Sequence, residues 1–407
     1  MIQMIGTDYQ LANVEKREKF SMTKKECAKV IQRIVEKEGV LGCVLLSTCN
    51  RTELYISSTG KTSLPLIKMF WDIRENLKEE DKAYIVQYEE EEAVRHLYHV
   101  CLGLCSQVLG DEQIIGQVGE ALQWSRENKG TNQELEVLFR IGMTGAKELK
   151  SQIPFFQKNP TLVSKSIQML KDRGILLQGK KCLVIGNGTM GKLAAVKLLE
   201  EGADVTVTVR QYRSGHVEIT KGAKIILYGD RMAHLKECSV IVSATQSPNY
   251  TITKEEVRKV GGKNPLFFLD LAMPRDIDPK VGELSFAIVY SLDSLEEEVY
   301  DEETKKNIFT AKEKAEEIVK KFFTWKEGRD FLPNIEAIME ESKKDFLFRT
   351  RKLFSSIENR EERQKVQEQA AKAAKKVSGR LLFQLRDKLE PEEFRQCLDA
   401  LEDVYGK

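Results

Sequence analysis

The stretch CLVIGNGTMGKLAAVKL, residues 182–198, decides the fold of the middle of this chain. Its first four residues form an apolar strand-like run, and three glycines follow at the spacing GxGxxG. An apolar-periodic run typical of a helix begins directly after them. This order of strand, glycine turn and helix is the fingerprint of a dinucleotide-binding unit. We therefore expect a Rossmann-like, doubly wound parallel sheet, with a tight turn that binds no ligand as the alternative.

Each glycine of this turn has a distinct role on that interpretation. Gly186 permits the tight turn, Gly188 lets the backbone approach a pyrophosphate, and Gly191 permits close packing of helix and strand. The phosphates would lie at the helix N-terminus, where free N–H groups favour anions. The predicted cofactor-binding residues of the turn are Gly186, Asn187, Gly188, Thr189, Met190 and Gly191.

The next strand-like run, residues 204–209, ends in Arg210, and Arg213 follows closely. A site for NAD favours an acidic residue here, which binds the ribose 2′-hydroxyl, whereas an arginine accommodates a 2′-phosphate. The sequence therefore favours NADP over NAD, with Arg210 and Arg213 as further cofactor-binding residues. A solvated charged loop is the alternative.

A second informative stretch, STCNRTE at residues 47–53, lies between two apolar strand-like segments. It places Cys49 at a strand end among polar and charged neighbours. Cationic and hydrogen-bonding groups favour a thiolate, whereas structural cysteines lie among apolar residues. Thr48, Asn50 and Arg51 could supply such groups. The stretch therefore predicts a cysteine nucleophile, with a polar loop and an incidental thiol as the alternative.

Together these stretches resemble the glutamyl-tRNA reductase family, whose NADPH-dependent members begin the C5 route to 5-aminolevulinate. The resemblance extends over nearly the whole chain in family order. Besides the two stretches above, it rests on His96-Leu97, GLCSQVLGDEQIIGQV at 103–118, SAT at 243–245 and DLAMPRDIDP at 270–279.

The second block of this resemblance departs from the family pattern at four positions. Cys105 stands in place of an aspartate, Asp111 of a glutamate, Glu112 of a proline and Gly119 of a lysine. The pattern is therefore that of a diverged member that keeps both the cysteine and the histidine.

The resemblance implies a two-step mechanism. Cys49 attacks the ester carbonyl that joins glutamate to the tRNA, and NADPH reduces the resulting thioester to glutamate 1-semialdehyde. A thiolate nucleophile thus divides a difficult reduction into easier steps. His96 is implied as the second catalytic residue, since histidine exchanges protons near neutral pH. The implied substrate-binding residues are Thr48, Asn50, Arg51, Ser106, Asp111, Glu112, Gln113 and Gln117.

One stretch offers a competing metal or haem site, because His96, His99, Cys101 and Cys105 are close in sequence. If the stretch is one helix, about 100° per residue places the cysteines opposite the histidines, unless Gly103 breaks it. Structural zinc sites also usually use short Cys pairs on turns. We therefore predict no metal site, and expect the two cysteines to be small buried thiols.

Length and composition bound the remaining possibilities. A chain of 407 residues should hold two or three domains. We find no apolar run of about 20 residues and no signal-peptide pattern at the start. Eight scattered cysteines then indicate reduced thiols, so we expect a cytoplasmic protein without membrane contact. The net charge of +1 predicts a modest tRNA footprint with a shallow salt dependence.

The patterning divides this α/β multidomain chain into three regions. Residues 1–150 mix short strands and helices, including the apolar-periodic stretch 92–125, and are expected to be an α+β catalytic domain that recognises glutamyl-tRNA. Residues 161–293 are the NADP-binding domain after a short linker. Residues 294–407 are expected to be a long helix and a helical dimerisation domain.

The last region has the clearest periodicity. Its apolar residues fall three or four apart before Pro333: Ile308, Ala311, Ala315, Ile318, Phe322 and Trp325. After Pro333 the stripe is resumed by Ile335, Ile338, Phe346, Leu353 and Ile357. Amphipathic helices of this kind need each other or a second subunit to bury such stripes. The resemblance implies a homodimer through these helices, and an intrachain helical bundle is the alternative.

Two other functions remain open at this stage. One is an NADP-dependent dehydrogenase that forms a thioester between Cys49 and another acyl substrate. The other is a diverged, non-catalytic regulator with the same fold, for which Cys105 is the motive. The resemblance also implies a transient complex with glutamate-1-semialdehyde aminotransferase. The sequence leaves haem feedback and the end product of the pathway open.

Overall fold

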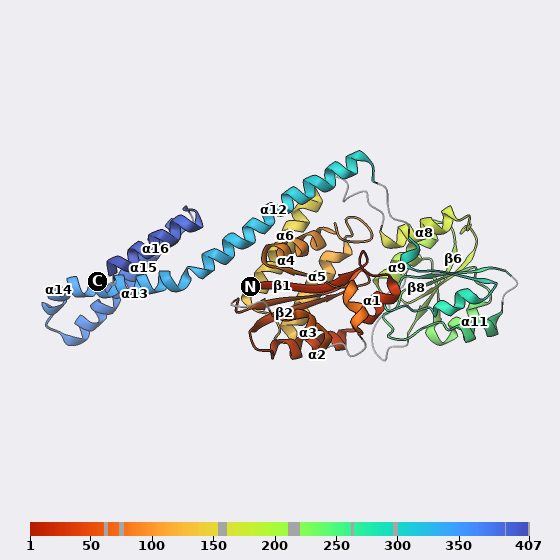
Figure 1. Cartoon of the computed structure of the whole chain (residues 1–407), viewed down its shortest axis with the longest axis horizontal. Helices are drawn as coiled ribbons and strands as arrows, with labels where there is room; N and C mark the ends of the chain where they lie inside the picture. The colour runs from red at the N-terminus through yellow and green to blue at the C-terminus, as the bar shows by residue number, and fades with distance from the viewer. Residues whose placement is uncertain are drawn as a thin grey trace. The chain divides into compact units, whose positions relative to one another are not determined.

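The computed structural model describes residues 1–60, 64–72, 77–153, 161–210, 220–261, 264–295, 300–386 and 388–405 (Figure 1). The chain separates into two compact units, residues 1–319 and 320–407. The first unit contains two sheets covered by helices, and the described residues of the second form helices and their connections. The expected α/β multidomain fold is confirmed in these terms.

The N-terminal domain is built on a four-stranded antiparallel sheet with the order β2-β3-β1-β4. Its strands are β1 (Ile2–Asp8), β2 (Val40–Ser47), β3 (Arg51–Ser58) and β4 (Val86–Glu89). Its helices are α1 (Val14–Phe20), α2 (Lys24–Val35), α3 (Leu66–Asp72), the short η1 (Glu79–Tyr84), α4 (Glu90–Leu102), α5 (Gln113–Glu127) and α6 (Gln133–Gln152).

The two faces of β3 bury different partners, because successive side chains of a strand point to opposite sides. Leu54 joins α2 and α3 in one core. Tyr55, on the other face, packs edge-on against Phe139 of α6 with ring centroids 5.5 Å apart. Arg51 and Glu53 share the face of Tyr55, so the strand carries two charged side chains toward α4 and α6.

The stretch 92–125, expected to be helical, is two helices separated by a loop. α4 ends at Leu102, and Gly103 follows it in the left-handed region with φ of 73°. Residues 103–112 then form a compact loop before α5 begins. A Cβ at Gly103 would lie 2.7 Å from the backbone nitrogen of Asp111, so the loop closes on itself only with glycine there.

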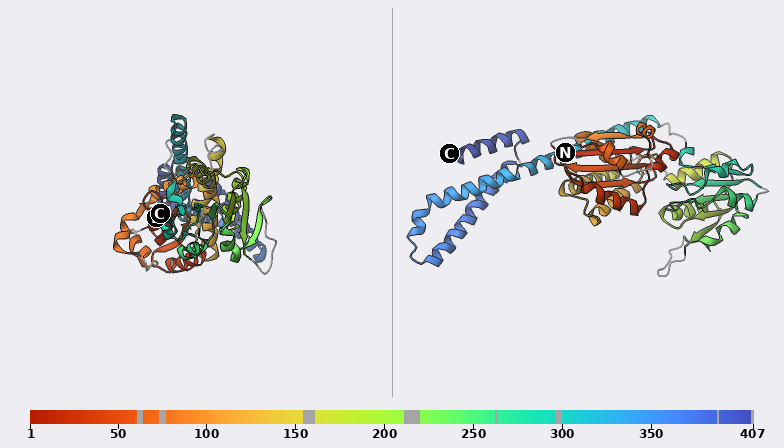
Figure 2. Two further views of the ribbon diagram at one scale, coloured as in Figure 1. Left: turned by 90° about the vertical axis from the view of Figure 1, so that its right-hand side faces the viewer. Right: turned by 60° about the horizontal axis from the view of Figure 1, so that its bottom comes forward.

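The second sheet has six parallel strands in the order β10-β9-β8-β5-β6-β7, which confirms the expected doubly wound fold (Figure 2). Its strands are β5 (Lys181–Ile185), β6 (Asp204–Val209), β7 (Lys224–Leu227), β8 (Val240–Ser243), β9 (Leu266–Asp270) and β10 (Ala287–Tyr290). Its helices are α8 (Leu162–Asp172), α9 (Thr189–Glu200), η2 (Tyr228–Asp230), α10 (Arg231–Leu235), α11 (Lys254–Val260), η3 (Pro279–Glu283) and η4 (Leu292–Ser294).

Helices cover both faces of this sheet, which explains its nearly continuous apolar strands. Cys182 and Val184 of β5 face the core formed with α8 and α9. Leu183 and Ile185 face the core formed with α10 and α11. The carboxyl ends of the central strands β5 and β8 therefore meet at one rigid edge, where the strand order reverses and ligands bind in such folds.

The long helix α12 (Glu302–Asp330) begins in the first unit and packs there against the N-terminal domain. Ala311 and Ala315 are fully buried. Glu316 accepts two hydrogen bonds from the guanidinium of Arg95, at 2.6 and 3.1 Å. Two residues of the expected apolar stripe, Ala311 and Ala315, are thus buried within the first unit. This corrects the expectation that the stripe needs another long helix or a second subunit.

The second unit contains an intrachain helical bundle. α13 (Leu332–Arg349) contacts α15 (Arg360–Arg386) and α16 (Pro391–Tyr405), with the short α14 (Arg351–Ser355) between α13 and α15 (Figure 2). Its core residues are Phe331, Ile335, Ile338, Leu382, Phe394 and Leu398. Apolar side chains also remain on its surface, since Phe348, Leu353 and Val377 are each more than 60% exposed.

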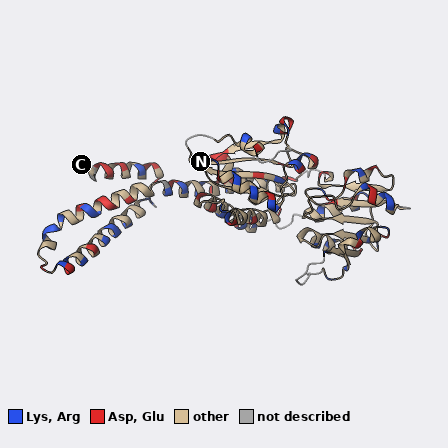
Figure 3. Cartoon of the chain, turned by 90° about the horizontal axis from the view of Figure 1, so that it is seen from below, with Lys and Arg blue, Asp and Glu red and all other residues tan. Residues whose placement is uncertain are grey.

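The charged residues of this unit alternate in sign along its helices (Figure 3). Glu340, for example, pairs with both Lys343 and Lys375. This agrees with solvated helix faces rather than a continuous basic patch for nucleic acid. Within the described ranges, none of the helices has the length and apolarity needed to cross a lipid bilayer.

Candidate active site

Cys49 lies in the tight hairpin that joins β2 to β3. The Thr48 N–H donates to the Arg51 carbonyl at 2.8 Å. The Thr48 hydroxyl accepts hydrogen bonds from the N–H groups of Asn50 and Arg51, at 3.2 and 3.3 Å. These bonds fix the backbone of the turn, so the largely buried Cys49 side chain is held at the strand end where the sequence predicted it.

The surroundings of the Cys49 thiol oppose its ionisation. Burial and the carboxylate of Asp111 raise the pKa of Cys49 to about 11, although the charges of Arg17 and Arg51 act in the opposite direction. The expected stabilisation of a thiolate by Arg51 is therefore outweighed in this structure. A base must take the proton when this thiol attacks a substrate.

The guanidinium of Arg51 forms its hydrogen bonds with Glu53 and Cys105. Its side chain is 1% exposed, and one terminal nitrogen donates to Glu53 Oε1 at 2.8 Å. The other terminal nitrogen donates to the backbone carbonyl of Cys105. This second bond ties β3 to the loop 103–112. The planar fork of arginine suits such simultaneous contacts.

Glu53 is the centre of this cluster, and the sequence did not single it out as a site residue. Besides the bond from Arg51, it accepts a hydrogen bond from the Tyr55 hydroxyl at 2.8 Å and contacts His96 Nε2 at 2.9 Å. Burial opposes its ionisation, but Arg51, His96 and Tyr55 outweigh it and lower the pKa of Glu53 to about 2. The sequence signal that could have identified Glu53 is its charge and its position two residues after Arg51, on the same face of the strand.

His96 of α4 is held in place by this carboxylate. Its Nε2 is the atom that contacts Glu53, and its ring lies 5.0 Å from that of Tyr88, centroid to centroid. In the described part of the chain, no hydrogen bond joins His96 to Cys49. The imidazole is therefore oriented by Glu53 and not by the thiol.

The loop 103–112 carries most of the other predicted substrate residues. Ser106 is buried, and its carbonyl accepts a hydrogen bond from the Tyr9 hydroxyl at 3.3 Å. Lys150 of α6 donates to the carbonyl of Asp111 at 2.6 Å, and Asp111 Oδ1 accepts from the Gln113 N–H at 2.9 Å. Contacts from three other elements thus hold this loop beside the hairpin.

Several polar atoms of the hairpin and this loop are buried without a hydrogen-bond partner in the described structure. They are Asn50 Oδ1, Arg51 Nε, Ser106 Oγ and Gln107 Oε1. Buried polar atoms are rarely left unpaired in native proteins, so this concentration indicates a place for a polar ligand. A carboxylate and an ammonium group, as an amino-acid ligand carries, are groups of the required kind.

Two predicted substrate residues are less closely connected. Glu112 is exposed to solvent, and Gln117 lies one turn into α5 with a partly buried side chain. Among the described residues, no hydrogen bond links Gln117 with the hairpin. The structure thus brings together Thr48, Asn50, Arg51, Ser106 and Asp111 but leaves Glu112 at the surface.

The competing metal site receives no support from the described residues, among which no three His, Cys, Asp or Glu side chains could hold an ion. His99 is partly buried, and burial lowers its pKa to about 4. Burial raises the pKa of Cys101 to about 12 and that of Cys105 to about 11. Both cysteines are therefore neutral thiols near pH 7.

The glycine turn after β5 has the geometry that a dinucleotide requires. Gly186 has a φ of 108°, and a Cβ there would lie 2.5 Å from the Ala244 carbonyl oxygen. A Cβ at Gly191 would lie 2.0 Å from the Gly186 carbonyl oxygen. At Gly188, the N-cap of α9, a Cβ would meet nothing within 4 Å. Gly186 and Gly191 thus allow backbone segments to pack closely, and Gly188 leaves open space at a helix N-terminus.

The residues predicted to select the cofactor lie beyond β6. Arg210 is exposed at the end of this strand, with its guanidinium 5.1 Å from the ring centre of Tyr228. Arg213 lies outside the described residues. An exposed cation at this position is free of any salt bridge among the described residues, so it could meet a 2′-phosphate.

Two family models match this chain, one over the N-terminal domain and one over the nucleotide domain. The family model described as "Glutamyl-tRNAGlu reductase, N-terminal domain" matches residues 5–153. The model described as "Shikimate / quinate 5-dehydrogenase" matches residues 168–298.

Individual relatives extend these matches along the chain. A glutamyl-tRNA reductase of Acetivibrio thermocellus is 36% identical over 326 residues, which are 80% of this chain and 97% of that protein. The enzyme of Alkaliphilus oremlandii is 37% identical over 72% of this chain and 87% of its own length. The solved glutamyl-tRNA reductase of Methanopyrus kandleri is 24% identical, with a TM-score of 0.45 over 100% of this chain and 98% of that chain.

Proposed function

Because the chain belongs to the glutamyl-tRNA reductase family, we propose that it reduces glutamyl-tRNA(Glu) to glutamate 1-semialdehyde with NADPH through a thioester on Cys49. This reaction is the first step of C5 tetrapyrrole synthesis. The observation that supports the chemistry best is the position of Cys49. The thiol lies at the end of a hairpin that leads directly into the Arg51–Glu53–His96 cluster.

In the first step, the Cys49 sulfur bonds to the ester carbonyl carbon, and the bond from that carbon to the ribose oxygen breaks. The thiol proton must leave during attack, because burial keeps the thiol neutral. His96 takes this proton and returns it to the ribose oxygen of the departing tRNA. Glu53 acts as a positioning residue, since its carboxylate contacts His96 Nε2 at 2.9 Å and orients the imidazole.

The glutamyl group is recognised by the unpaired polar atoms near the hairpin. Arg51 Nε and the Ser106 hydroxyl can donate to a carboxylate, and Asn50 Oδ1 can accept from the ammonium group. Thr48, Asp111, Glu112, Gln113 and Gln117 complete the proposed substrate set, with Glu112 contributing from the exposed rim. Recognition by hydrogen bonds explains how a site could select glutamate, because an analogue lacking these groups leaves buried atoms unpaired.

NADPH supplies the hydride that reduces the thioester. The residues Gly186 to Gly191 fit its pyrophosphate, since Gly188 opens onto free space at the N-terminus of α9. Arg210, with Arg213, would bind the 2′-phosphate. Thr245 lies beside the turn, since its Cγ2 would be 3.2 Å from a Cβ at Gly186.

The remaining parts of the proposal concern assembly. Residues 1–150 recognise the glutamyl end, residues 161–293 bind NADPH, and residues 294–407 pair two copies of the chain. Exposed Phe348, Leu353 and Val377 support pairing through the helical bundle. A transient complex with glutamate-1-semialdehyde aminotransferase would protect the reactive aldehyde. We propose a cytoplasmic location for the whole reaction.

The test is NADPH oxidation by the purified protein with glutamyl-tRNA, beside uncharged tRNA plus free glutamate. Oxidation only with glutamyl-tRNA is the expected result. Cys49→Ser should abolish both thioester formation and oxidation while NADPH still binds. No oxidation by the unaltered protein, with NADPH bound, would favour another acyl substrate or a regulatory role. Unchanged turnover in Cys49→Ser would remove this residue from the mechanism.

A further inference from the structure

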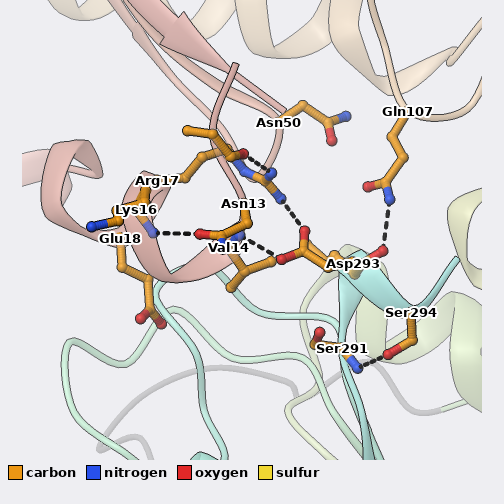
Figure 4. Close-up of polar contacts among 12 residues, drawn as sticks. Asn13, Val14, Lys16, Arg17, Glu18, Asn50, Gln107, Ser291, Asp293 and Ser294 are labelled. Atoms are coloured by element: carbon orange, nitrogen blue, oxygen red, sulfur yellow. Dashed lines mark hydrogen bonds and ion pairs between the residues drawn. The ribbon is translucent and has the colours of Figure 1, made fainter. Parts of the chain in front are cut away.

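The short segment η4, residues 292–294, follows the last strand of the nucleotide sheet and is bonded by the N-terminal domain from two sides (Figure 4). The Val14 N–H, at the start of α1, donates to Asp293 Oδ2 at 2.6 Å. Arg17, one turn further along α1, pairs with Asp293 Oδ1 at 3.3 Å. Gln107 Nε2 donates to the Leu292 carbonyl at 2.6 Å.

Gln107 links this segment to the proposed substrate loop. It is the next residue after Ser106, whose unpaired hydroxyl is assigned to the glutamyl group. The Gln107 side chain reaches η4, while the neighbouring Cys105 carbonyl is held by Arg51. The substrate loop is thus bonded to β3 through the Cys105 carbonyl and to the nucleotide domain through the Gln107 side chain.

Arg17 links the same segment to the nucleophile. Its side chain is 3% exposed, and one terminal nitrogen donates to the Ala12 carbonyl at 2.6 Å. Its charge is among those that favour the Cys49 thiolate. Since the bond to Ala12 lies within the N-terminal domain, Arg17 should stay near Cys49 when its contact with Asp293 is removed.

A second contact also joins α1 to the nucleotide domain. Glu18 accepts hydrogen bonds from Arg275 Nε and Nη2 at 2.9 and 2.6 Å, and from the Arg275 N–H at 2.6 Å. Arg275 belongs to the loop that follows β9 at the carboxyl end of the strand. α1 is therefore held by two separate carboxylate contacts to the nucleotide domain.

We propose that Asp293 is a positioning residue that sets the Cys49 thioester against the nucleotide domain for hydride transfer, and that it has no part in forming the thioester. This inference rests on the proposed function and deepens it. In reduction, hydride and a proton convert the thioester to an aldehyde and the Cys49 thiol, and NADPH becomes NADP⁺. In the competing reaction, water cleaves the same thioester to free glutamate and the thiol, with no change in oxidation state.

The two outcomes can be counted with glutamyl-tRNA labelled in its glutamyl group. The measured quantity is the ratio of semialdehyde to free glutamate at saturating NADPH. Asp293→Ala should lower this ratio by about 10- to 100-fold, the loss expected when reacting groups are displaced by about 1 Å. Thioester formation without NADPH, and the affinity for NADPH measured by fluorescence, should each change by no more than about twofold.

Asp204→Ala is the matched control, because Asp204 is also an ion-paired carboxylate of this domain with a 37% exposed side chain. Within the described structure its side chain pairs with Lys224 of the same domain at 2.7 Å, so this variant should leave the ratio unchanged. Glu18→Gln should lower the ratio in the same direction as Asp293→Ala. If Asp293→Ala proves unstable, Asp293→Asn keeps an acceptor for Val14 and tests the loss of charge alone.

Each result bears on the proposal differently. An unchanged ratio in Asp293→Ala overturns it, and so does an equal loss of thioester formation and reduction, which would indicate only a structural role. Failure of the unaltered protein to form a thioester would overturn the proposed function itself. A lower ratio with normal thioester formation and normal NADPH affinity is the supporting result.

Discussion

Replacement of Glu53 by glutamine tests the charged cluster most directly. Glu53 Oε1 contacts both Arg51 and His96, and Oε2 accepts from Tyr55. Glutamine has nearly the same shape, but it is neutral and carries an NH₂ group where one carboxylate oxygen stood. The change therefore leaves the Arg51 cation, which is 1% exposed, without its charged partner and reverses the hydrogen bond with the Tyr55 hydroxyl.

The size of the effect follows from the pKa of Glu53, which falls from 4.5 to about 2 on folding. At about 1.4 kcal/mol per tenfold change in proton affinity, this corresponds to roughly 3 kcal/mol of stability at pH 7. Removing one partner of a buried ion pair typically costs about 3–5 kcal/mol, which agrees. Because the unfolded chain takes up this proton near pH 4.5, the contribution is complete above that pH. It is lost as the pH falls toward 2.

Urea unfolding followed by tryptophan fluorescence measures this loss. Two of the three tryptophans, Trp71 and Trp124, lie in the N-terminal domain and report on it. Glu53→Gln should lower the free energy of unfolding by about 3 kcal/mol at pH 7 and show a smaller further loss between pH 4.5 and 2. Glu91→Gln is the matched control, since Glu91 is a 62% exposed partner of Arg95 and should cost less than about 0.5 kcal/mol.

The reasoning fails if Glu53→Gln and Glu91→Gln are equally stable at pH 7. It also fails if the acid sensitivity of the two variants is the same. A stable Glu53→Gln protein that still forms the Cys49 thioester at the normal rate would further show that His96 does not depend on this carboxylate.

Three other predictions follow from the two sites. Cys49 should react with iodoacetamide at a rate that rises about tenfold per pH unit from pH 7 to 9, because its pKa is raised to about 11. Peptide mass spectrometry measures this rate, and a rate that stops rising near pH 8 would contradict the prediction. Arg210→Asp should weaken NADPH by about 10- to 100-fold and NADH much less, and equal losses in fluorescence titrations would exclude a 2′-phosphate contact. Gly191→Ala should destabilise the nucleotide domain in thermal unfolding, because its Cβ would lie 2.0 Å from the Gly186 carbonyl oxygen. Gly188→Ala should fold normally yet bind NADPH weakly. Normal NADPH binding by both variants would refute the assignment of this turn to the pyrophosphate.

The sequence predicted the nucleotide domain well, because its determinants are local. The glycine spacing after β5 requires a particular turn, and the apolar strands reflect burial on both faces. The helical stretch 92–125 was predicted less well. Gly103 marks the end of α4, but a single glycine does not distinguish a helix end from a tolerated interior position.

Only the part of the site formed by residues close together in the sequence could be predicted. Cys49 and its hairpin were found from one stretch of sequence, whereas the role of Glu53 depends on His96, 43 residues away. The contact of Arg17 with Asp293 joins positions 276 residues apart. No local pattern encodes such pairs. The prediction that neighbouring cations would stabilise the Cys49 thiolate was wrong, because burial, a property of the folded chain, outweighs them.

The departure from the family pattern at Cys105 has a physical account in the same geometry. Arg51 bonds to the backbone carbonyl of Cys105, which any residue at that position provides. Asp111 likewise uses its own carbonyl to bind Lys150 and a carboxylate oxygen, which glutamate also possesses, to accept from the Gln113 N–H. The residues Cys105 and Asp111 therefore keep the contacts that hold the loop. We expect them to change the side-chain groups that meet the substrate and to leave the fold of the site unchanged.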